Sequence, residues 1–297
     1  MLARHRPWTV PLMLVALLLL GAVAPALAAQ DEPLRVGGEV SRPEKISGEG
    51  PQYTEIARKA GLSGVVIVEA IIDEKGHVIN ARILKGLPLG LDQAALEAVQ
   101  TWRFKPAKLN RKPVKVYYTL TVNFQVEPGI SAGPVFAAFL QKALTFRDQL
   151  QRRDYRAASE YLDNWARERP EDTEVRLAWA YLLLHQGRLS DSFREALAYK
   201  GPGPYEIFYR IAGTALRHAT QNSRSLTPAE RVQVIELGLR ATDKALEDNP
   251  DGYEALAYKS LLLKEMAGLA QDPAEREALM REARQLQEKA DSLAGEG

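Results

Sequence analysis

The clearest pattern in this sequence is a strict alternation of apolar and polar positions after Pro113. Every second residue from Val114 to Val126 is apolar or aromatic, and the positions between them, from Lys115 to Gln125, are polar except for Tyr117. A period of two predicts a β-strand with one face toward a core and the other toward solvent. Such a strand can lie at the edge of a sheet, where one row of backbone donors and acceptors stays free.

Two further strands are predicted upstream. Residues 64–72 (GVVIVEAII) are almost all apolar and rich in β-branched types, which predicts a central strand covered on both faces. Residues 77–84 alternate again, and the stretch from Asp73 to Gly76 has the composition of a tight turn, so the two strands should form an antiparallel hairpin. Helical spacing predicts short helices over 53–60 and 92–100, the first ending at Gly61.

Beyond a Gly- and Pro-rich segment near residue 130, helical spacing continues to the C-terminus. Pro170 and Pro204 lie 34 residues apart, the period of tetratricopeptide repeats, and Gly187 falls in the turn between two helices on that frame. The region therefore resembles a tetratricopeptide array with an irregular insertion before Pro228. A non-repetitive helical bundle is the alternative. Helices are predicted over 135–151, 154–168, 173–186, 190–199, 205–220, 228–248, 252–269 and 273–293.

The N-terminus has the features of a secretory signal. Arg4 and Arg6 precede an uncharged, mostly apolar stretch that ends in a small-x-small site at Ala26 to Ala28. Cleavage there would remove both arginines and change the formal net charge from +1 to −1. The alternative is an uncleaved membrane anchor, because the stretch is long enough to span a bilayer as a helix. The expected location is the periplasm, with anchoring in the inner membrane as the alternative.

These patterns divide the chain into five segments. Residues 1–29 are a signal peptide or anchor, and 30–52 are an extended, Gly-, Pro- and charge-rich lead-in with little structure of its own. Residues 53–128 form the first domain, 129–134 a linker, and 135–294 the helical domain. The predicted fold class is α+β, a small antiparallel sheet with packed helices, followed by an all-α, tetratricopeptide-like domain.

Composition excludes several functions. The absence of cysteine removes disulfides, thiolate metal sites and thiol nucleophiles. A net charge of +1 provides no broad basic field for nucleic acid. The run from Arg103 to Lys115 contains six basic residues and no acidic one, and we interpret it as a solvated turn rather than a patch for acidic partners or lipid headgroups. The four histidines are scattered and no phosphate-binding, hydrolase or metalloprotease motif occurs, so no enzyme activity, metal or cofactor is expected.

A series of short motifs between residues 51 and 126 resembles the TonB C-terminal domain family, the periplasmic end of outer-membrane energy transducers. Each motif is weak alone, but their order and spacing agree with the family over about a third of the chain. The matching pieces are Pro51-x-Tyr53, Gly61-x-x-Gly64-Val65-Val66, Ile72-Asp73-x-x-Gly76-x-Val78, Leu91-Asp92-x-Ala94-Ala95, Trp102-Arg103-Phe104-x-Pro106 and Lys112-Pro113-Val114.

The resemblance implies a non-catalytic domain whose last strand accepts an extended peptide, the TonB box of an outer-membrane receptor, by β-augmentation. On this chain it implies a partner-binding strand formed by Val116, Tyr117, Tyr118, Thr119, Leu120, Thr121, Val122, Asn123 and Phe124. The motif residues have structural roles and do no chemistry: Tyr53, Gly64, Asp73, Gly76, Leu91, Asp92, Trp102, Phe104 and Pro106.

This sequence departs from the family pattern in several places. Thr54 stands where the motif usually has a second proline, and the apolar N-terminal run carries no histidine. The spacer before the domain is short, and the domain is followed by a long helical region rather than ending the chain. These departures put energy transduction in question but not the fold.

Three hypotheses follow for the function. The first is a periplasmic interaction protein in outer-membrane transport whose sheet captures an extended segment of a receptor or another periplasmic protein, and whose helices offer a second binding surface. The second is a membrane-anchored energy transducer, which would contact the membrane only if the N-terminus is uncleaved. The third is a structural module whose sheet serves for homodimerisation or for docking the helices.

Overall fold

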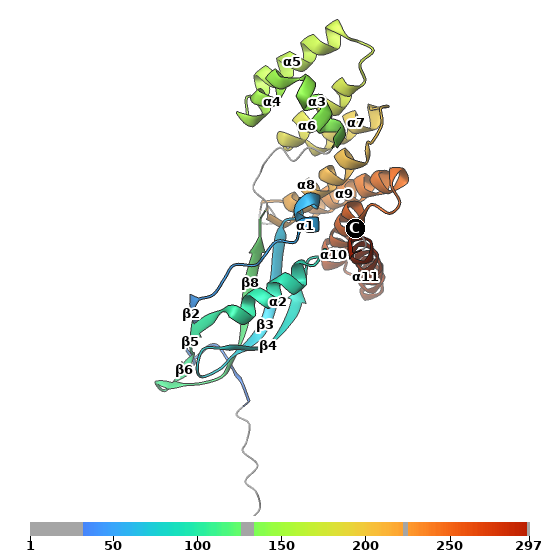
Figure 1. Cartoon of the computed structure of the whole chain (residues 1–297). Helices are drawn as coiled ribbons and strands as arrows, with labels where there is room; N and C mark the ends of the chain where they lie inside the picture. The colour runs from blue at the N-terminus through green and yellow to red at the C-terminus, as the bar shows by residue number, and fades with distance from the viewer. Residues whose placement is uncertain (1–31, 126–133, 222–224, 296–297) are drawn as a thin grey trace, which may run out of the picture.

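The computed structural model describes residues 32–125, 134–221 and 225–295, which form a small sheet-and-helix part followed by an all-helical part (Figure 1). The predicted signal sequence or anchor and most of the predicted linker lie outside these residues. The main sheet has the strand order β1-β8-β3-β4. Its strands are β1 (Leu34–Arg35), β3 (Gly64–Ile72), β4 (Val78–Lys85) and β8 (Val116–Phe124).

The central strand β3 pairs antiparallel with both β4 and β8, which agrees with the predicted hairpin and alternating strand. The expectation that β3 is covered on both faces holds at its end, where Ile71 and Ile72 are both buried, but not along its whole length. Its even-numbered side chains, such as Val66 and Val68, are fully buried, whereas Val65, Ile67 and Glu69 on the other face are only partly buried. The helices α1 (Glu55–Ala60) and α2 (Leu91–Thr101) belong to this part, and α2 packs on the sheet.

The lead-in is more structured than its composition suggests. It contributes β1, which runs parallel to β8 and makes the sheet mixed, and β2 (Glu44–Ser47), which pairs antiparallel with β5 (Arg103–Lys105). A small hairpin of β6 (Lys108–Leu109) and β7 (Lys112–Pro113) precedes β8, so the long alternating strand begins at Val116 and not at Pro113.

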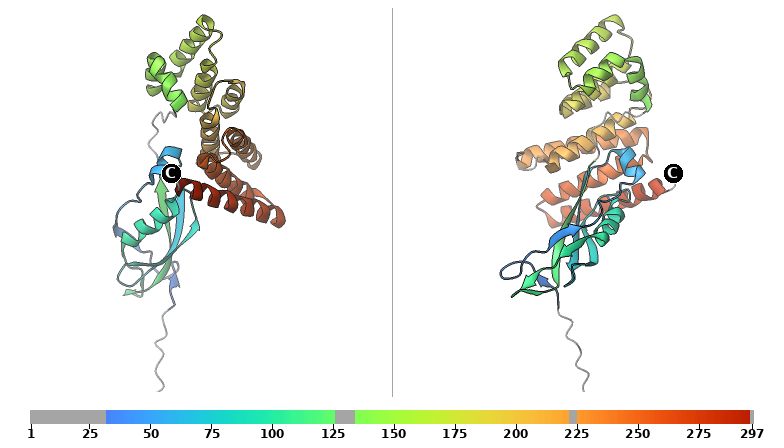
Figure 2. Two further views of the ribbon diagram at one scale, coloured as in Figure 1. Left: turned by 45° about the vertical axis from the view of Figure 1, so that its right-hand side comes forward. Right: turned by 60° about the vertical axis from the view of Figure 1, so that its left-hand side comes forward.

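The helical part is an elongated array of packed helices, with α10 and α11 lying beside the sheet part (Figures 1 and 2). Its first predicted helix is divided in two, because the backbone at Ala143 leaves helical geometry with φ −110° and ψ 60°. The helices are α3 (Pro134–Lys142), α4 (Leu144–Gln151), α5 (Tyr155–Glu168), α6 (Glu174–His185), α7 (Leu189–Ala198), α8 (Tyr205–Gln221), α9 (Pro228–Asp248), α10 (Tyr253–Leu269) and α11 (Pro273–Gly295).

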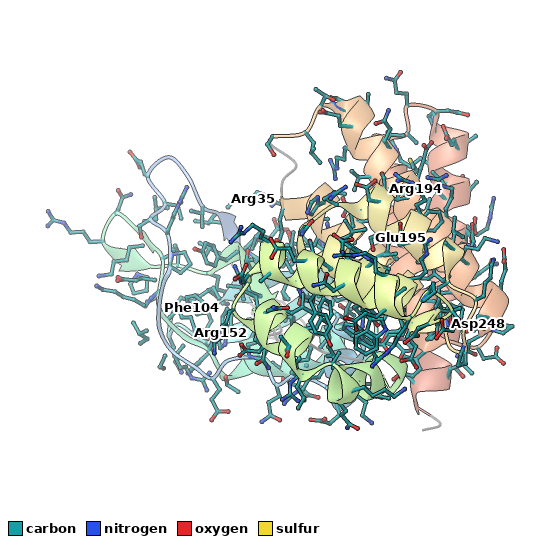
Figure 3. All side chains as sticks on the ribbon, turned by 90° about the horizontal axis from the view of Figure 1, so that it is seen from above. Arg35, Phe104, Arg152, Arg194, Glu195 and Asp248 are labelled. Carbon is teal, nitrogen blue, oxygen red and sulfur yellow. The ribbon has the colours of Figure 1, made fainter. Side chains whose placement is uncertain are left out.

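Successive helices pack against one another, including α6 with α7, α8 with α9, and α10 with α11. Gly187 lies in the turn between α6 and α7 with φ +76°, the left-handed conformation that favours glycine there. Exposed charged residues such as Arg152, Arg194 and Asp248 lie on the surface of this array (Figure 3). The tetratricopeptide interpretation stays a prediction, because packed helix pairs are also found in other helical folds.

Candidate functional site

The strand β8 is paired along its whole length on one flank only. Its register with β3 runs without a shift from Val116, opposite Ile72, to Phe124, opposite Gly64. On the other flank β1 pairs with only two residues, Val116 and Tyr117. From Tyr118 to Phe124, no strand in the described part of the chain pairs with this outer flank.

The direction of the free backbone groups follows from one hydrogen bond. The amide of Leu34 donates to the carbonyl of Lys115 at 2.9 Å, so that carbonyl faces the outer flank. Backbone groups alternate in direction along a strand, and the register of β8 has no bulge, so odd-numbered residues face outward. The free row is therefore Thr119, Thr121 and Asn123. Their side chains are exposed on the open face of the sheet, whereas the even-numbered Leu120 and Val122 are buried.

The lead-in strand β1 is held by side chains as well as by the ladder. The guanidinium of Arg35 lies 5.3 Å from the ring centre of Tyr117 and 4.0 Å from a carboxylate oxygen of Glu69. Glu69 also accepts hydrogen bonds from Arg82 on β4. After β1 the chain turns back, with Gly37 and Val40 exchanging both of their backbone hydrogen bonds. This turn takes the chain away before it can cover more of β8.

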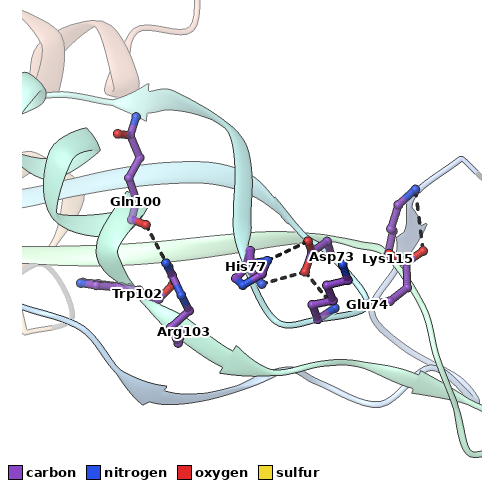
Figure 4. A network of polar contacts seen from close by, with 8 residues as sticks. Asp73, Glu74, His77, Gln100, Trp102, Arg103 and Lys115 are labelled. Atoms are coloured by element: carbon purple, nitrogen blue, oxygen red, sulfur yellow. Dashed lines mark hydrogen bonds and ion pairs between the residues drawn. The ribbon is translucent and has the colours of Figure 1, made fainter.

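Two of the family motif residues, Asp73 and Gly76, lie in the turn between β3 and β4, and the contacts of this turn give each of them a structural role (Asp73 is labelled in Figure 4). One oxygen of Asp73 accepts hydrogen bonds from the amides of Lys75 at 2.9 Å and His77 at 2.7 Å, and the other lies 3.2 Å from Nδ1 of His77. Desolvation opposes ionisation, but these hydrogen bonds outweigh it and hold the pKa of Asp73 below its usual value. Asp73 thus stabilises the hairpin.

Gly76 is required by the neighbouring strand. It has φ +83°, and a Cβ at this position would lie 1.7 Å from the carbonyl oxygen of Phe104. Its own carbonyl accepts a hydrogen bond from the amide of Phe104 at 2.8 Å. The hairpin and the chain leaving α2 are therefore in direct backbone contact, which requires a residue without a Cβ at position 76.

Trp102 and Phe104 provide the core at this end of the domain. Both rings are largely buried, and Phe104 packs edge-on against Tyr118 of β8 with ring centres 6.1 Å apart. The indole nitrogen of Trp102 donates to the carbonyl of Glu49, and the ammonium of Lys45 on β2 lies 3.4 Å from the centre of its ring. The strand β5 ends at Lys105, directly before Pro106.

The other motif residues connect α1 and α2 to the sheet. Tyr53 packs edge-on against Phe124 of β8 and donates a hydrogen bond to the carbonyl of Leu62. Leu91 is fully buried, and Asp92 accepts from the amide of Leu87 at 2.6 Å. Burial raises the pKa of the Asp92 carboxyl.

Gly64, at the start of β3, lies against the side chain of Leu87. A Cβ on Gly64 would come within 2.9 Å of that side chain, so the glycine permits Leu87 to pack closely on the strand.

Thr54, which replaces the second proline of the family motif, has a clear structural role. Its hydroxyl accepts from the amide of Ala57 at 3.3 Å as the N-cap of α1, and it donates to the carbonyl of Leu89 at 2.7 Å. The substitution therefore keeps the lead-in of the domain tied to the loop before α2.

The basic run after Trp102 forms β5 and the exposed hairpin of β6 and β7. Two of its cations have acidic neighbours: Lys105 lies 3.6 Å from Glu44 and Lys115 lies 3.7 Å from Glu74. Within the described ranges, no group of acidic or histidine side chains is arranged to hold a metal ion. The same ranges contain no helix that is both long and apolar enough to cross a bilayer.

The comparisons with known proteins agree with this geometry. Residues 49–126 match the family described as "Gram-negative bacterial TonB protein C-terminal". The chain is 36% identical over 90 residues to Protein TonB of Vibrio cholerae serotype O1, and 32% identical over 75 residues to Protein TonB of Xanthomonas campestris pv. campestris strain B100. These alignments cover 30% and 25% of this chain, and 37% and 34% of the relatives.

The chain therefore carries a TonB C-terminal domain at residues 49–126. It spans about a third of the length of the curated relatives that it matches, and the similarity lies in this domain.

Sequence reasoning missed the part of the lead-in that limits the candidate edge. Leu34 and Arg35 pair with the start of β8, although the two-residue strand is too short to give a detectable alternation. The sequence signal that could have indicated this pairing is the presence of two apolar residues, Val36 and Val40, within a polar segment. Both residues pack against the core.

Proposed function

We propose that this protein is a cell-envelope interaction protein whose TonB-like domain captures an extended peptide segment along β8. The observation that carries the proposal is the unpaired outer flank from Tyr118 to Phe124, with the backbone groups of Thr119, Thr121 and Asn123 directed outward. An added strand could pair with this row through main-chain hydrogen bonds, which is the basis of β-augmentation.

The family match supports the choice of partner. TonB C-terminal domains imply recognition of TonB boxes, the extended segments of outer-membrane receptors, and the family is not enzymatic. We therefore propose the TonB box of a receptor, or a similar periplasmic segment, as the occupant of the free edge. All nine residues of β8 remain the proposed binding strand, but the two at its start, Val116 and Tyr117, are already paired with β1.

The binding experiment uses synthetic peptides that copy the periplasm-facing N-terminal segments of outer-membrane receptors from the same organism. Binding to the purified chain is measured by fluorescence anisotropy. Thr119→Pro or Thr121→Pro should abolish binding, because proline removes an outward amide and distorts the strand. The matched variants Thr119→Val and Thr121→Val keep the amide and the β-branched shape, so their affinity should stay within about threefold of the unchanged chain.

Circular dichroism distinguishes a loss of binding from a loss of fold. The outward amides are not paired with β3, so the proline variants should keep the sheet. Peptide binding that survives both prolines in folded protein would refute edge pairing as the mechanism.

The two other hypotheses of the sequence analysis have tests of their own. A membrane-anchored energy transducer requires an intact N-terminus, and mass spectrometry of the protein from the cell envelope would find the first residues retained. We propose instead that the chain is cleaved near Ala29. A homodimer that uses β8 as its interface would be seen by sedimentation and would be broken by Thr121→Pro.

A further inference from the structure

A cavity lies between the two parts of the molecule, on the side of the sheet away from the proposed peptide edge. It has a volume of about 260 Å³ and is lined by residues at the start of β3, at the end of β4 and on α8 and α10. These elements are labelled in Figure 1. An engineered apolar cavity of about 150 Å³ in another protein is large enough to hold benzene, so this one has room for a small organic molecule. Ligand sites are frequent at such interfaces between domains.

The inner surface of the cavity is apolar. Leu87 comes from the loop after β4, and Leu216 and Leu261 come from α8 and α10; all three side chains are buried. Tyr258 completes this surface, and its hydroxyl is already used in a hydrogen bond to the carbonyl of Ala60. The inner surface therefore favours an apolar body and offers it few unpaired polar groups.

The rim of the cavity is positively charged. Lys85 and Arg217 are exposed there, and Lys264 lies beside them, half-buried. The one acidic lining residue, Glu265, is paired with Lys85 at 2.9 Å and with Arg231 at 2.5 Å. Arg231, Asp92 and Asp291 lie close to these lining residues. Together the group has four cations (Lys85, Arg217, Arg231 and Lys264) and three acids (Asp92, Glu265 and Asp291), which leaves a net charge of +1.

Lys264 is half-buried, and its ammonium donates a hydrogen bond to the side-chain oxygen of Gln287. Burial lowers the pKa of its ammonium and the positive charge of Lys85 lowers it further, although Asp92 and Asp291 oppose both effects. An anion placed between Lys85, Lys264 and Arg217 would offset this repulsion. The guanidinium of Arg217 donates to the hydroxyl of Thr214 on its own helix, and it has further N–H groups with which to bind a ligand.

We infer that this cavity binds a small amphipathic monoanion, with a carboxylate or similar head at the cationic rim and an apolar chain against the leucines. Because both parts of the chain line the cavity, an occupant would stabilise their packed arrangement by mass action. No residue of β8 lines this cavity, so the test of the ligand site does not depend on the proposed peptide binding.

The probe is sodium octanoate, titrated into the full chain and followed by isothermal titration calorimetry. A ligand of this size should saturate one site with a dissociation constant of about 0.1–1 mM. Octyl glucoside has an apolar chain of similar length with an uncharged head, and acetate has the charge without the chain. Each should bind at least about tenfold more weakly than octanoate.

Two variants locate the site. Thr220→Phe places a ring in the cavity from the half-buried face of α8 and should abolish octanoate binding. Arg217→Gln should weaken it roughly tenfold. Arg156→Gln is the matched control, because Arg156 is an exposed arginine of α5 that does not line the cavity, and it should leave the affinity unchanged.

The inference is overturned if octanoate shows no saturable binding, or if the variants that fold normally bind it as the unchanged chain does. Equal affinity for octyl glucoside would overturn the assignment of an anionic ligand. Equal affinity for acetate would overturn the apolar half of the assignment.

Discussion

The hydroxyl of Tyr258 on α10 donates to the carbonyl of Ala60 at the end of α1, at 3.1 Å and in a buried site. This hydrogen bond joins the helical part to the TonB C-terminal domain across 198 residues of sequence. Gly213 on α8 makes it possible, because a Cβ there would lie 2.7 Å from the ring of Tyr258. Nearby, Asp291 of α11 accepts from the amide of Leu89 at 2.6 Å. The helices are thus packed onto the domain by specific polar contacts.

Tyr258→Phe should destabilise the chain by about 1–3 kcal/mol, because the carbonyl of Ala60 would stay buried without its donor. The measurement is the urea midpoint of unfolding, followed by circular dichroism. Tyr155→Phe is the matched control, because the Tyr155 hydroxyl also donates to a carbonyl, that of His185 at 3.3 Å, but at an exposed site within the helical part. A shift no larger than in the control would contradict the role given to Tyr258.

Gly76→Ala should cost more than about 2 kcal/mol, because the new methyl group would collide with the carbonyl of Phe104 and the residue would be strained at positive φ. Gly268→Ala provides the opposite control. Gly268 is exposed near the end of α10 and a methyl group there would meet open space, so alanine should raise stability by about 0.5–1 kcal/mol. Thermal unfolding of the two variants should therefore shift in opposite directions. Shifts in the same direction would show that the Gly76 turn is not under this constraint.

The sequence predicted those elements that have a long and regular pattern. The alternating residues of β8, the apolar run of β3 and the turn at Asp73 and Gly76 were all found, because side-chain period and turn chemistry are local properties. The helical positions after residue 134 were also close to those observed, apart from the break at Ala143. The motif series identified the domain because the order of several weak signals carries more information than any single one.

Features that depend on long-range contact could not be predicted in the same way. The strand β1 consists of two exposed residues, and its structure comes from its pairing with Val116 and Tyr117 and from the contacts of Arg35. Val65 and Ile67 on β3 are partly exposed because the described elements do not fully cover this open face of the sheet. The positively charged rim of the cavity is formed by Lys85, Arg217 and Lys264. These residues are far apart in the sequence, and only the tertiary fold brings them together.

Asp73→Asn should lower stability by about 1 kcal/mol at neutral pH, because the amide oxygen accepts the same hydrogen bonds without a charge. The pKa of Asp73 is lowered in the folded chain, so its contribution is fully present above the ordinary value of about 3.9 and is lost as pH falls through the lower folded-state pKa. The difference in melting temperature between the two proteins should therefore vanish at strongly acidic pH. Asp163→Asn, at an exposed position of α5, is the control and should change stability little at either pH. A constant difference at every pH would mean that the Asp73 charge does not contribute.

Leu34→Pro tests whether β1 limits the proposed peptide edge. The amide of Leu34 donates to the carbonyl of Lys115, and proline has no amide hydrogen to donate. Leu34 is 37% exposed, so the substitution itself leaves the core of the domain intact, and detaching β1 also breaks the contacts of Arg35 with Tyr117 and Glu69. The free row would then extend back to Tyr117, and one additional main-chain hydrogen bond should tighten binding of a sufficiently long receptor peptide about fivefold. Leu34→Val keeps the amide and should bind as the unchanged chain does. If the proline variant is folded and binds no more tightly than the valine variant, β1 does not compete with the peptide for β8.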